Sequence, residues 1–490
     1  MFNPNARPTR VLVASSYSIS GDTLGGPTVS AKPHTKAQPT ERVWMLGTVL
    51  AVALLVRTLY LLSIRHAFFF DHLVTEPQRY DAWAMDIVRG VAPARPPFDE
   101  APAYPYFLAF VYSVAGHNRF AVTALQALLD AGSCAAVVVF VLRAFPESPR
   151  RAWIAGLVAA FFGPTIYFTG QLEPATLAVF AVSLGLATTP LDAKASPRAW
   201  ALSGAVWAAG VLVRSEIVLA LPLVLLHAWL LGKRPALLRT SIAPAVLLAG
   251  SLAINAASSG HFVLLTTGSG VNLWIGNNEH ADGTNPFVEG DLERTARAIE
   301  TQTSDAVVAD ALFRARALAA MRASPGRASR LFARKLVWLW TDRELPNAMD
   351  IEWQEKQSFV FAVPFVPFRF GVVFALACAG VVVARRRLRS MLVLFAPAAV
   401  AVVVSVVFFT NARFRLVLAP SLAIFAAVAL DTVWSMRKRV DRRALVAPAA
   451  AFVLAALLAF GDWGGVRTHR LSAIDDNTRA LENAAKHAPR

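Results

Sequence analysis

Long apolar runs recur along this chain, and they constrain its fold more than any other feature. A helix needs about 20 consecutive apolar residues to cross the hydrocarbon core of a membrane. Runs close to this length recur between residues 43 and 461, and only 16% of all residues are charged, against about 25% in soluble proteins. The sequence therefore predicts an all-α polytopic membrane protein. It excludes an ordinary soluble enzyme, a disordered protein and a small disulfide scaffold.

The apolar runs define about eleven candidate transmembrane spans, three of which are short for a full crossing. They are 43–64, 119–142, 152–170, 174–188, 199–213, 217–231, 240–258, 359–384, 390–409, 416–435 and 444–461.

The net charge of +16 is concentrated in short loops, which indicates how the spans are oriented. Every even-numbered span is followed by arginines or lysines, for example Arg150 and Arg151 after the second span. Because such loops stay on the cytoplasmic side, we expect the two long loops to lie on the other side, which is the periplasm for a bacterial inner membrane. The basic excess does not suggest nucleic acid, since no soluble basic domain is present.

This orientation divides the chain into five parts. They are a disordered cytoplasmic tail (1–42), an N-terminal transmembrane module (43–258) that includes a long first outer loop (65–118), an extracytoplasmic loop domain (259–358), C-terminal transmembrane helices (359–461) and an outer tail (462–490). Within 259–358 we expect a strand over 261–267, helices near 291–323 and an amphipathic helix over 326–341. The outer segment is thus predicted to be a small mixed α/β unit.

Ionisable residues from distant parts of the chain are expected at one membrane depth, near the outer boundary. Charges at such a depth are costly unless paired or solvated, so they are candidates for function. The alternative is that each is a solvated loop charge or a structural ion pair. The candidates are Glu76, Asp81, Glu100, Glu173, Arg214, Glu216, Arg413 and Arg415, with Arg57 inside the first span.

Asp130 and Gln126 are four residues apart in the second span and share a helix face. We interpret them as a buried hydrogen-bonded pair. A proton or substrate path is the rival interpretation.

Outward carboxylates beside outward arginines suit sugar transfer from a lipid phosphate. A carboxylate can take the proton of the attacking hydroxyl group. An arginine can stabilise the phosphate leaving group through two parallel hydrogen bonds.

At these residues the sequence resembles the GT-C superfamily of membrane glycosyltransferases, in the branch of the protein O-mannosyltransferases and the aminoarabinose transferase of lipid A. The resembling stretches are EPQRYDAWAMDIVRG, FDEAPAYPYF, QLEPATLAVF, VLVRSEIVLALP, GVNLWIGNNEHADG, RKLVWLWTDRELPN and NARFRLVLAP. Two departures occur: Ala101 replaces a lysine of the aminoarabinose transferases, which disfavours that substrate, and Ser215 replaces a proline.

The resemblance implies a GT-C-like fold and an inverting transfer from a polyprenyl-phosphate sugar at the outer face. Glu76 would be the general base, with Asp81 as the fallback, and Glu100 and Glu173 would position acceptor or sugar. Arg214, Arg413 and Arg415 would hold the phosphate, with Arg57 as a further candidate. Asn277 and Asn278 would contact sugar hydroxyls or form a plain turn. A divalent cation stays open, since no ligand cluster has a recognisable spacing.

The acceptor is expected to be a lipid, a glycan or a protein. Two other functions stay open: a polytopic transporter or flippase, and a surface-glycan polymerase or ligase that uses a diphosphate-linked donor. The oligomeric state is not indicated by the sequence.

Overall fold

The computed structural model describes residues 38–91, 98–284, 291–346, 349–363, 368–436 and 443–467, with a few positions up to residue 483. The N-terminal tail lies outside these residues up to residue 37, and so do parts of the first outer loop, of the 259–358 segment, of the loop after residue 436 and of the outer tail. The described part is built from helices, and it contains no β-strand, only an isolated bridge between Phe162 and Phe368.

The first half of the chain forms these elements: α1 (Pro39–Ile64), α2 (Phe68–Asp71), α3 (Thr75–Val88), α4 (Ala103–Ala115), α5 (Arg119–Ala144), α6 (Pro149–Ala160), α7 (Gly163–Phe168), α8 (Ala175–Thr188), α9 (Pro197–Val213), the 3-10 helix η1 (Ser215–Ala220) and α10 (Leu221–Ser259). The second half forms α11 (Ser269–Asn277), α12 (Asp291–Gln302), α13 (Ala306–Ala323), α14 (Pro325–Leu339), α15 (Ile351–Glu355), α16 (Phe359–Ala362), α17 (Phe370–Ala384), η2 (Arg385–Phe395), α18 (Ala396–Val407), α19 (Ala412–Arg415), η3 (Leu416–Leu418), α20 (Ala419–Met436), α21 (Arg443–Phe460) and η4 (Trp463–Gly465).

Within the described residues, six helical stretches are long and apolar enough to cross a membrane. They are Pro39–Ile64, Arg119–Ala144, Ser215–Ser259, Phe370–Val407, Ala412–Ser435 and Arg443–Phe460. Two of them join spans that the sequence separates. The stretch Ser215–Ser259 breaks at Lys233, whose φ of 58° lies in the left-handed region, between the expected spans 217–231 and 240–258. The prediction of an all-helical, multi-pass membrane protein is confirmed.

Some expected spans are shorter or broken in the structure. The span expected at 152–170 is divided into α6 and α7, and the Gly163 amide donates to the carbonyl of Phe368 (2.9 Å) instead of continuing the helix. The span expected at 359–384 is a helix only from Phe370 onward, apart from the four residues of α16.

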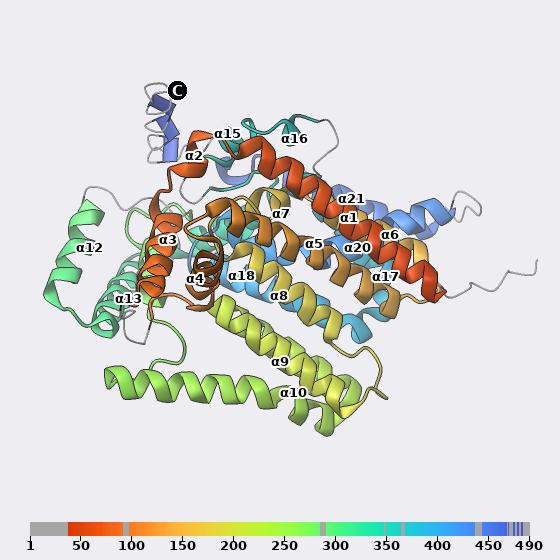
Figure 1. Ribbon diagram of the computed structural model, residues 1–490, viewed down its shortest axis with the longest axis horizontal. Helices are drawn as coiled ribbons and strands as arrows, with labels where there is room; N and C mark the ends of the chain where they lie inside the picture. The colour runs from red at the N-terminus through yellow and green to blue at the C-terminus, as the bar shows by residue number, and fades with distance from the viewer. Residues whose placement is uncertain are drawn as a thin grey trace, which may run out of the picture. The chain divides into compact units, whose positions relative to one another are not determined.

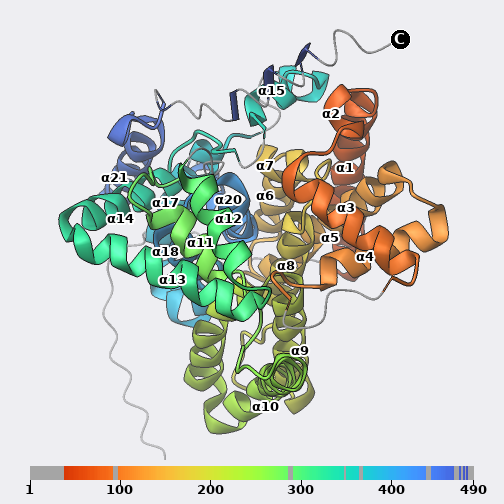
Figure 2. The same cartoon turned by 90° about the vertical axis from the view of Figure 1, so that its left-hand side faces the viewer.

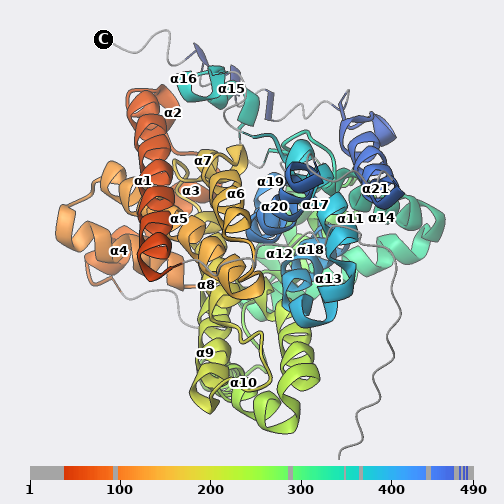
Figure 3. The ribbon, with the colours of Figure 1, turned by 90° about the vertical axis from the view of Figure 1, so that its right-hand side faces the viewer.

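Two groups of helices build the centre of the fold. Helices α1, α5 and α6 pack together in one group and α17 packs with α20 and α21 in the other, while α20 also contacts α6 (Figure 3). Helices α9 and α10 pack along each other at one edge (Figure 1). Helices α11, α12, α13 and α14 of the 259–358 segment are grouped beside the bundle (Figure 2).

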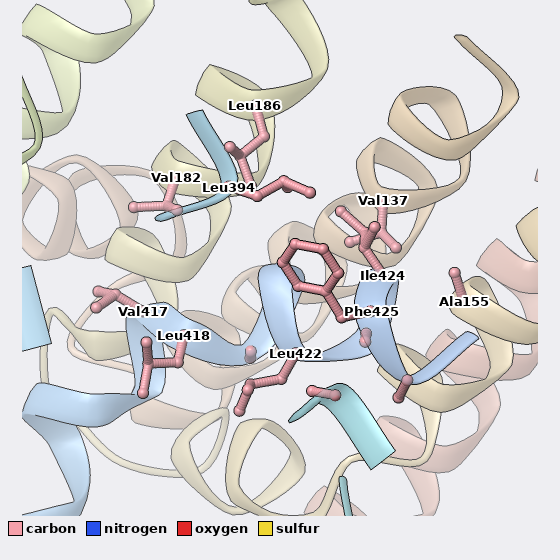
Figure 4. Packing of buried hydrophobic residues seen from close by; sticks show 14 of the residues in the cluster. Val137, Ala155, Val182, Leu186, Leu394, Val417, Leu418, Leu422, Ile424 and Phe425 are labelled. Carbon is pink, nitrogen blue, oxygen red and sulfur yellow. The ribbon is translucent and has the colours of Figure 1, made fainter. Parts of the chain in front are cut away.

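The largest apolar core lies where α20 meets its neighbours. Phe425 points into a cluster that includes Val137 of α5, Val182 of α8 and Leu394 of η2 (Figure 4). Helices α17 and α20 approach closely because position 380 is glycine, where a Cβ atom would collide with the Phe425 carbonyl.

One buried ion pair joins α1 to α5 inside the core. Arg57 is fully buried, and its Nε donates to Oδ2 of Asp130 over 2.7 Å, while Nη1 donates to the carbonyl of Ala160 over 2.5 Å. Gln126, one turn earlier on α5, donates instead to the carbonyls of Thr169 (3.0 Å) and Gln171 (2.9 Å). Asp130 is thus paired with an arginine, and each of the two polar residues on α5 has a partner of its own.

The strand expected over residues 261–267 does not form, so the prediction of a mixed α/β segment is not supported there. The backbone of this stretch bonds to other partners. Asn255 of α10 donates its side-chain amide to the carbonyls of Val263 (2.8 Å) and Leu265 (3.1 Å). The Thr267 amide donates to the carbonyl of Phe98 (2.9 Å).

Candidate functional site

A cavity of about 580 Å³ lies between α3, η1, α13, α18, α19 and the segments 99–101 and 262–269. Its lining residues are of two chemical kinds. Some are apolar, such as Leu219, Leu264 and Val407. Others are carboxylates and arginines, namely Glu76, Asp99, Glu100, Glu216, Asp310, Arg214, Arg314 and Arg413. A cavity of this kind can hold an apolar chain and a polar head at the same time.

Glu76 and Arg413 form the central ion pair of the cavity. Both terminal nitrogens of the Arg413 guanidinium donate to the Glu76 carboxylate: Nη2 to Oε1 over 3.0 Å, and Nη1 to Oε2. The Arg413 side chain is 9% exposed and the Glu76 side chain 21% exposed. This two-pronged geometry is the one in which arginine also binds phosphate.

Arg214 and Glu216 form a second pair in the same wall. The aromatic ring of Phe414 contacts both arginines, since the guanidinium carbons of Arg214 and Arg413 are each 5.1 Å from its centre. Arg214 also donates to the backbone carbonyl of Arg413 over 3.5 Å. The two cations are therefore held close together, which requires negative charge nearby.

The backbone on both sides of the Glu76–Arg413 pair is tightly fixed. Thr75, which directly precedes Glu76, has a φ of 54°, a strained value for a β-branched residue. On the other side, the Thr410 amide donates to the carbonyl of Gly283 (2.9 Å) and the Ala412 amide to the carbonyl of Leu345 (2.8 Å). The loop segment 259–358 thus positions the arginine.

Lys335 of α14 is fully buried and anchors the end of α18, next to this site. Its Nζ donates to the carbonyl of Phe408 (2.6 Å) and to Oδ1 of Asn277 (2.8 Å). Burial lowers the pKa of Lys335 to about 7. Helix α14 therefore packs against α18 with the face that carries Lys335.

Glu100 lies at the edge of the cavity and pairs with Arg79. Arg79 also lies 3.6 Å from Asp99. Oε2 of Glu100 is buried and accepts no hydrogen bond from the described residues. This oxygen is the acceptor that Glu100 can offer to a hydroxyl group.

Glu173 lies in the connection between α7 and α8 and is only 5% exposed. It lines a small pocket behind Arg413, together with Gln171 and Gln354. Its Oε2 has no hydrogen-bond partner among the described residues. Burial raises the pKa of Glu173 to about 7, although the charge of Arg214 acts in the opposite direction.

Asp81 lies on another face of α3 from Glu76 and does not line the cavity. Its carboxylate accepts hydrogen bonds from the Tyr112 hydroxyl (2.5 Å) and from His117 (2.9 Å), and Arg119 is 3.7 Å away. These contacts tie α3 to the end of α4 and the start of α5.

Four further candidates also lie away from the cavity. Arg415 donates to the carbonyls of Leu339 (3.1 Å) and Thr341 (2.5 Å), and it pairs with Glu344 over 2.9 Å. Arg57 is the buried partner of Asp130. Asn278 donates to the carbonyl of Trp274 in its own helix, whereas Asn277 donates both to Leu273 and to the carbonyl of Val407 (2.8 Å), and so connects α11 to α18.

Sequence reasoning did not single out Phe414, Arg79 or the pair of Asp310 and Arg314, which lies in the α13 wall of the cavity. Phe414 lies inside NARFR, so the motif contained it. Nothing in the sequence signals that its ring contacts two arginines.

No group of three or more histidine, cysteine, aspartate or glutamate side chains that could hold a metal ion occurs among the described residues.

The family model of dolichyl-phosphate-mannose-protein mannosyltransferases matches residues 99–258, about a third of the chain. The matched region contains Glu100, Glu173, Arg214 and Glu216, whereas Glu76 and Arg413 lie outside it. No curated protein matches the chain. This match and the multi-pass helical architecture agree with the sequence motifs, and they support an integral membrane glycosyltransferase of the GT-C superfamily.

Proposed function

We propose that the protein transfers a sugar from a polyprenyl-phosphate donor to a hydroxyl acceptor, with inversion, at the outer face of the membrane. The observation that carries this proposal is the combination of Glu76, Arg413 and Arg214 in one cavity that is also lined by apolar side chains such as Leu219, Leu264 and Val407. The arginines suit the phosphate, and the apolar walls suit the first part of the polyprenyl chain.

In the proposed reaction, the acceptor oxygen attacks the anomeric carbon and Glu76 takes the hydroxyl proton. The bond between the anomeric carbon and the phosphate oxygen breaks, and its electron pair stays on the phosphate. Polyprenyl phosphate leaves with an additional negative charge, which Arg413 and Arg214 stabilise. The new bond forms on the opposite face of the sugar, so the configuration inverts.

Glu100 and Glu173 have different places in this proposal. Glu100 lies at the cavity edge with a buried acceptor oxygen, so it suits a hydroxyl group of sugar or acceptor. Glu173 lines a small pocket with Arg413, and its carboxylate interacts electrostatically with Arg214. Arg415 and Arg57 take no part in phosphate binding, because backbone carbonyls and buried carboxylates occupy them.

The test is transfer by the purified protein in lipid nanodiscs, with radiolabelled polyprenyl-phosphate mannose and membrane extract from a deletion strain as the source of acceptor. We expect a labelled product from wild type and from Asp81→Asn, but at least a hundredfold slower transfer from Glu76→Gln. Asp81→Asn is the matched control, since it changes a carboxylate of the same helix outside the cavity.

Full activity of Glu76→Gln would refute the assignment of the base. Transfer only from a diphosphate-linked oligosaccharide would instead indicate a surface-glycan ligase. Substrate uptake into sealed vesicles without any new glycosidic bond would indicate a transporter.

A further inference from the structure

The arginines that line the cavity share one feature: each is already paired with a carboxylate that lines the same cavity. Arg413 is paired with Glu76, Arg214 with Glu216, and Arg314 with Asp310. A phosphate that enters the cavity must therefore compete with a protein carboxylate for any of these cations.

The competition is most direct at Arg413. Its two terminal nitrogens both point at the Glu76 carboxylate, and its Nε has no hydrogen-bond partner among the described residues. Two phosphate oxygens bind an arginine in the same parallel arrangement as two carboxylate oxygens. The Glu76 carboxylate thus occupies the guanidinium edge that a phosphate group would use.

The same pairing limits Glu76 as a base. A carboxylate that accepts two hydrogen bonds from a guanidinium is stabilised in its charged form and accepts a further proton less readily. When Arg413 turns to another anion, the Glu76 carboxylate loses these two hydrogen bonds.

We propose that the donor phosphate displaces Glu76 from Arg413, so that donor binding itself releases the carboxylate that takes the acceptor proton. Glu216 is the corresponding counter-ion of Arg214: a positioning residue that keeps the arginine in place and yields to the phosphate. This inference rests on the proposed function. It adds an order of events to that function: the donor binds first, and only then is Glu76 free to take the acceptor proton.

The arrangement also explains why these carboxylates are partly exposed while the arginines are almost buried. The side chains of Glu76 and Glu216 are 21% and 23% exposed, whereas those of Arg413 and Arg214 are 9% and 8% exposed. A carboxylate that must leave its partner can move into the cavity and be solvated there. The cations stay fixed by Phe414 and by the anchored backbone.

The experiment measures binding of a short-chain polyprenyl phosphate, which carries no sugar and cannot react, to the full-length protein in nanodiscs. Removal of the competing charge should tighten binding, so we expect Kd to fall about three- to tenfold in Glu76→Gln and in Glu216→Gln. Arg413→Ala should raise Kd by at least about tenfold. The uncharged polyprenol should bind equally to all these variants, because the competition concerns only the phosphate.

Glu344→Gln is the matched control. It neutralises the carboxylate of Glu344, the partner of Arg415. Arg415 is two residues after Arg413 in the chain, but neither Arg415 nor Glu344 lines the cavity, so we expect no change in Kd for polyprenyl phosphate. A thermal denaturation curve for each variant checks that it is folded. Since two glutamates are tested independently, the loss of one variant to misfolding leaves the other decisive.

An unchanged or higher Kd in Glu216→Gln or Glu76→Gln, with Arg413→Ala still weakened, would overturn the displacement proposal alone. A Kd that none of the arginine or glutamate variants alters would instead show that the phosphate binds elsewhere, and the proposed donor site itself would fall.

Discussion

Arg413 donates two parallel hydrogen bonds to the carboxylate of Glu76, although the two residues are 337 positions apart in the chain. The pair connects the start of α3 with α19, and thus the first loop segment with the second half of the bundle. Its geometry depends on the planar fork of arginine, which lysine cannot reproduce.

We therefore expect Arg413→Lys to raise the KM for the lipid-linked donor by about tenfold or more. A point charge stays in place, but the two-pronged contact is lost. Steady-state kinetics with varied donor concentration measure the change. Arg415→Lys is the comparison two residues away: it should lower thermal stability, because Arg415 holds backbone carbonyls, and leave the donor KM near the wild-type value.

Glu173→Gln should change how stability depends on pH. Burial raises the pKa of Glu173 to about 7, above the ordinary value of 4.5. The folded state therefore binds more protons than the unfolded state between these values, and wild type loses stability as pH rises through this window. Because glutamine has no such cost, the variant should be as stable as wild type near pH 4 and more stable at pH 8. The gain is on the order of 3 kcal/mol at most.

Thermal unfolding of both proteins between pH 4 and pH 9 tests this expectation. A constant difference in Tm across the range would contradict it.

The contribution of Lys335 to stability depends on pH in the opposite direction. Burial lowers its pKa from 10.5 to about 7, so the unfolded state binds more protons between these values, and wild type gains stability as pH rises from 7 towards 10. Lys335→Met removes this contribution and also the hydrogen bonds to Phe408 and Asn277.

We expect the Tm of wild type relative to Lys335→Met to increase with pH over that window. Transfer activity of the variant should also fall, since the end of α18 next to the cavity loses its anchor. A Tm difference between wild type and Lys335→Met that is the same at all pH values would contradict the lowered pKa of Lys335.

The Arg57–Asp130 pair should behave as a structural element. Replacement of one partner alone leaves a buried charge without compensation, which costs about 3–5 kcal/mol. The double variant Arg57→Met with Asp130→Leu should recover most of this loss. Thermal stability of the two single variants and the double variant gives the coupling between the residues. A folded double variant without transfer activity would show that the pair has a role in the reaction as well.

The sequence predicted the class of the fold well and the composition of the site only in part. Apolar runs report directly on long apolar helices, so most of the expected spans coincide with helices to within several residues. The depth of a charge along a helix could also be estimated, which is why Glu76, Arg214 and Arg413 were candidates. Hydropathy does not report which way a side chain points, and Asp81 and Arg415 were for that reason grouped with residues that face the cavity.

Which charged residues pair with each other could be predicted least from the sequence. Arg57 and Asp130 were each noticed, yet as separate features, because nothing in one sequence reveals that two charges in different spans face each other. The strand expected at 261–267 was inferred from a short run of β-favouring residues. A side chain of α10 and the backbone near residue 98 take its hydrogen bonds instead.

The ion pair inside the bundle has a consequence for how the protein is made. An arginine inside a span costs up to about 2.5–3.5 kcal/mol to insert into a membrane on its own, and Arg57 lies in the second half of α1. Its partner Asp130 is synthesised 73 residues later, so α1 emerges with a charge that only α5 can neutralise. Insertion of the first helix is thus completed by the arrival of a later one, and biogenesis of the N-terminal half is a cooperative event between two distant segments of the nascent chain.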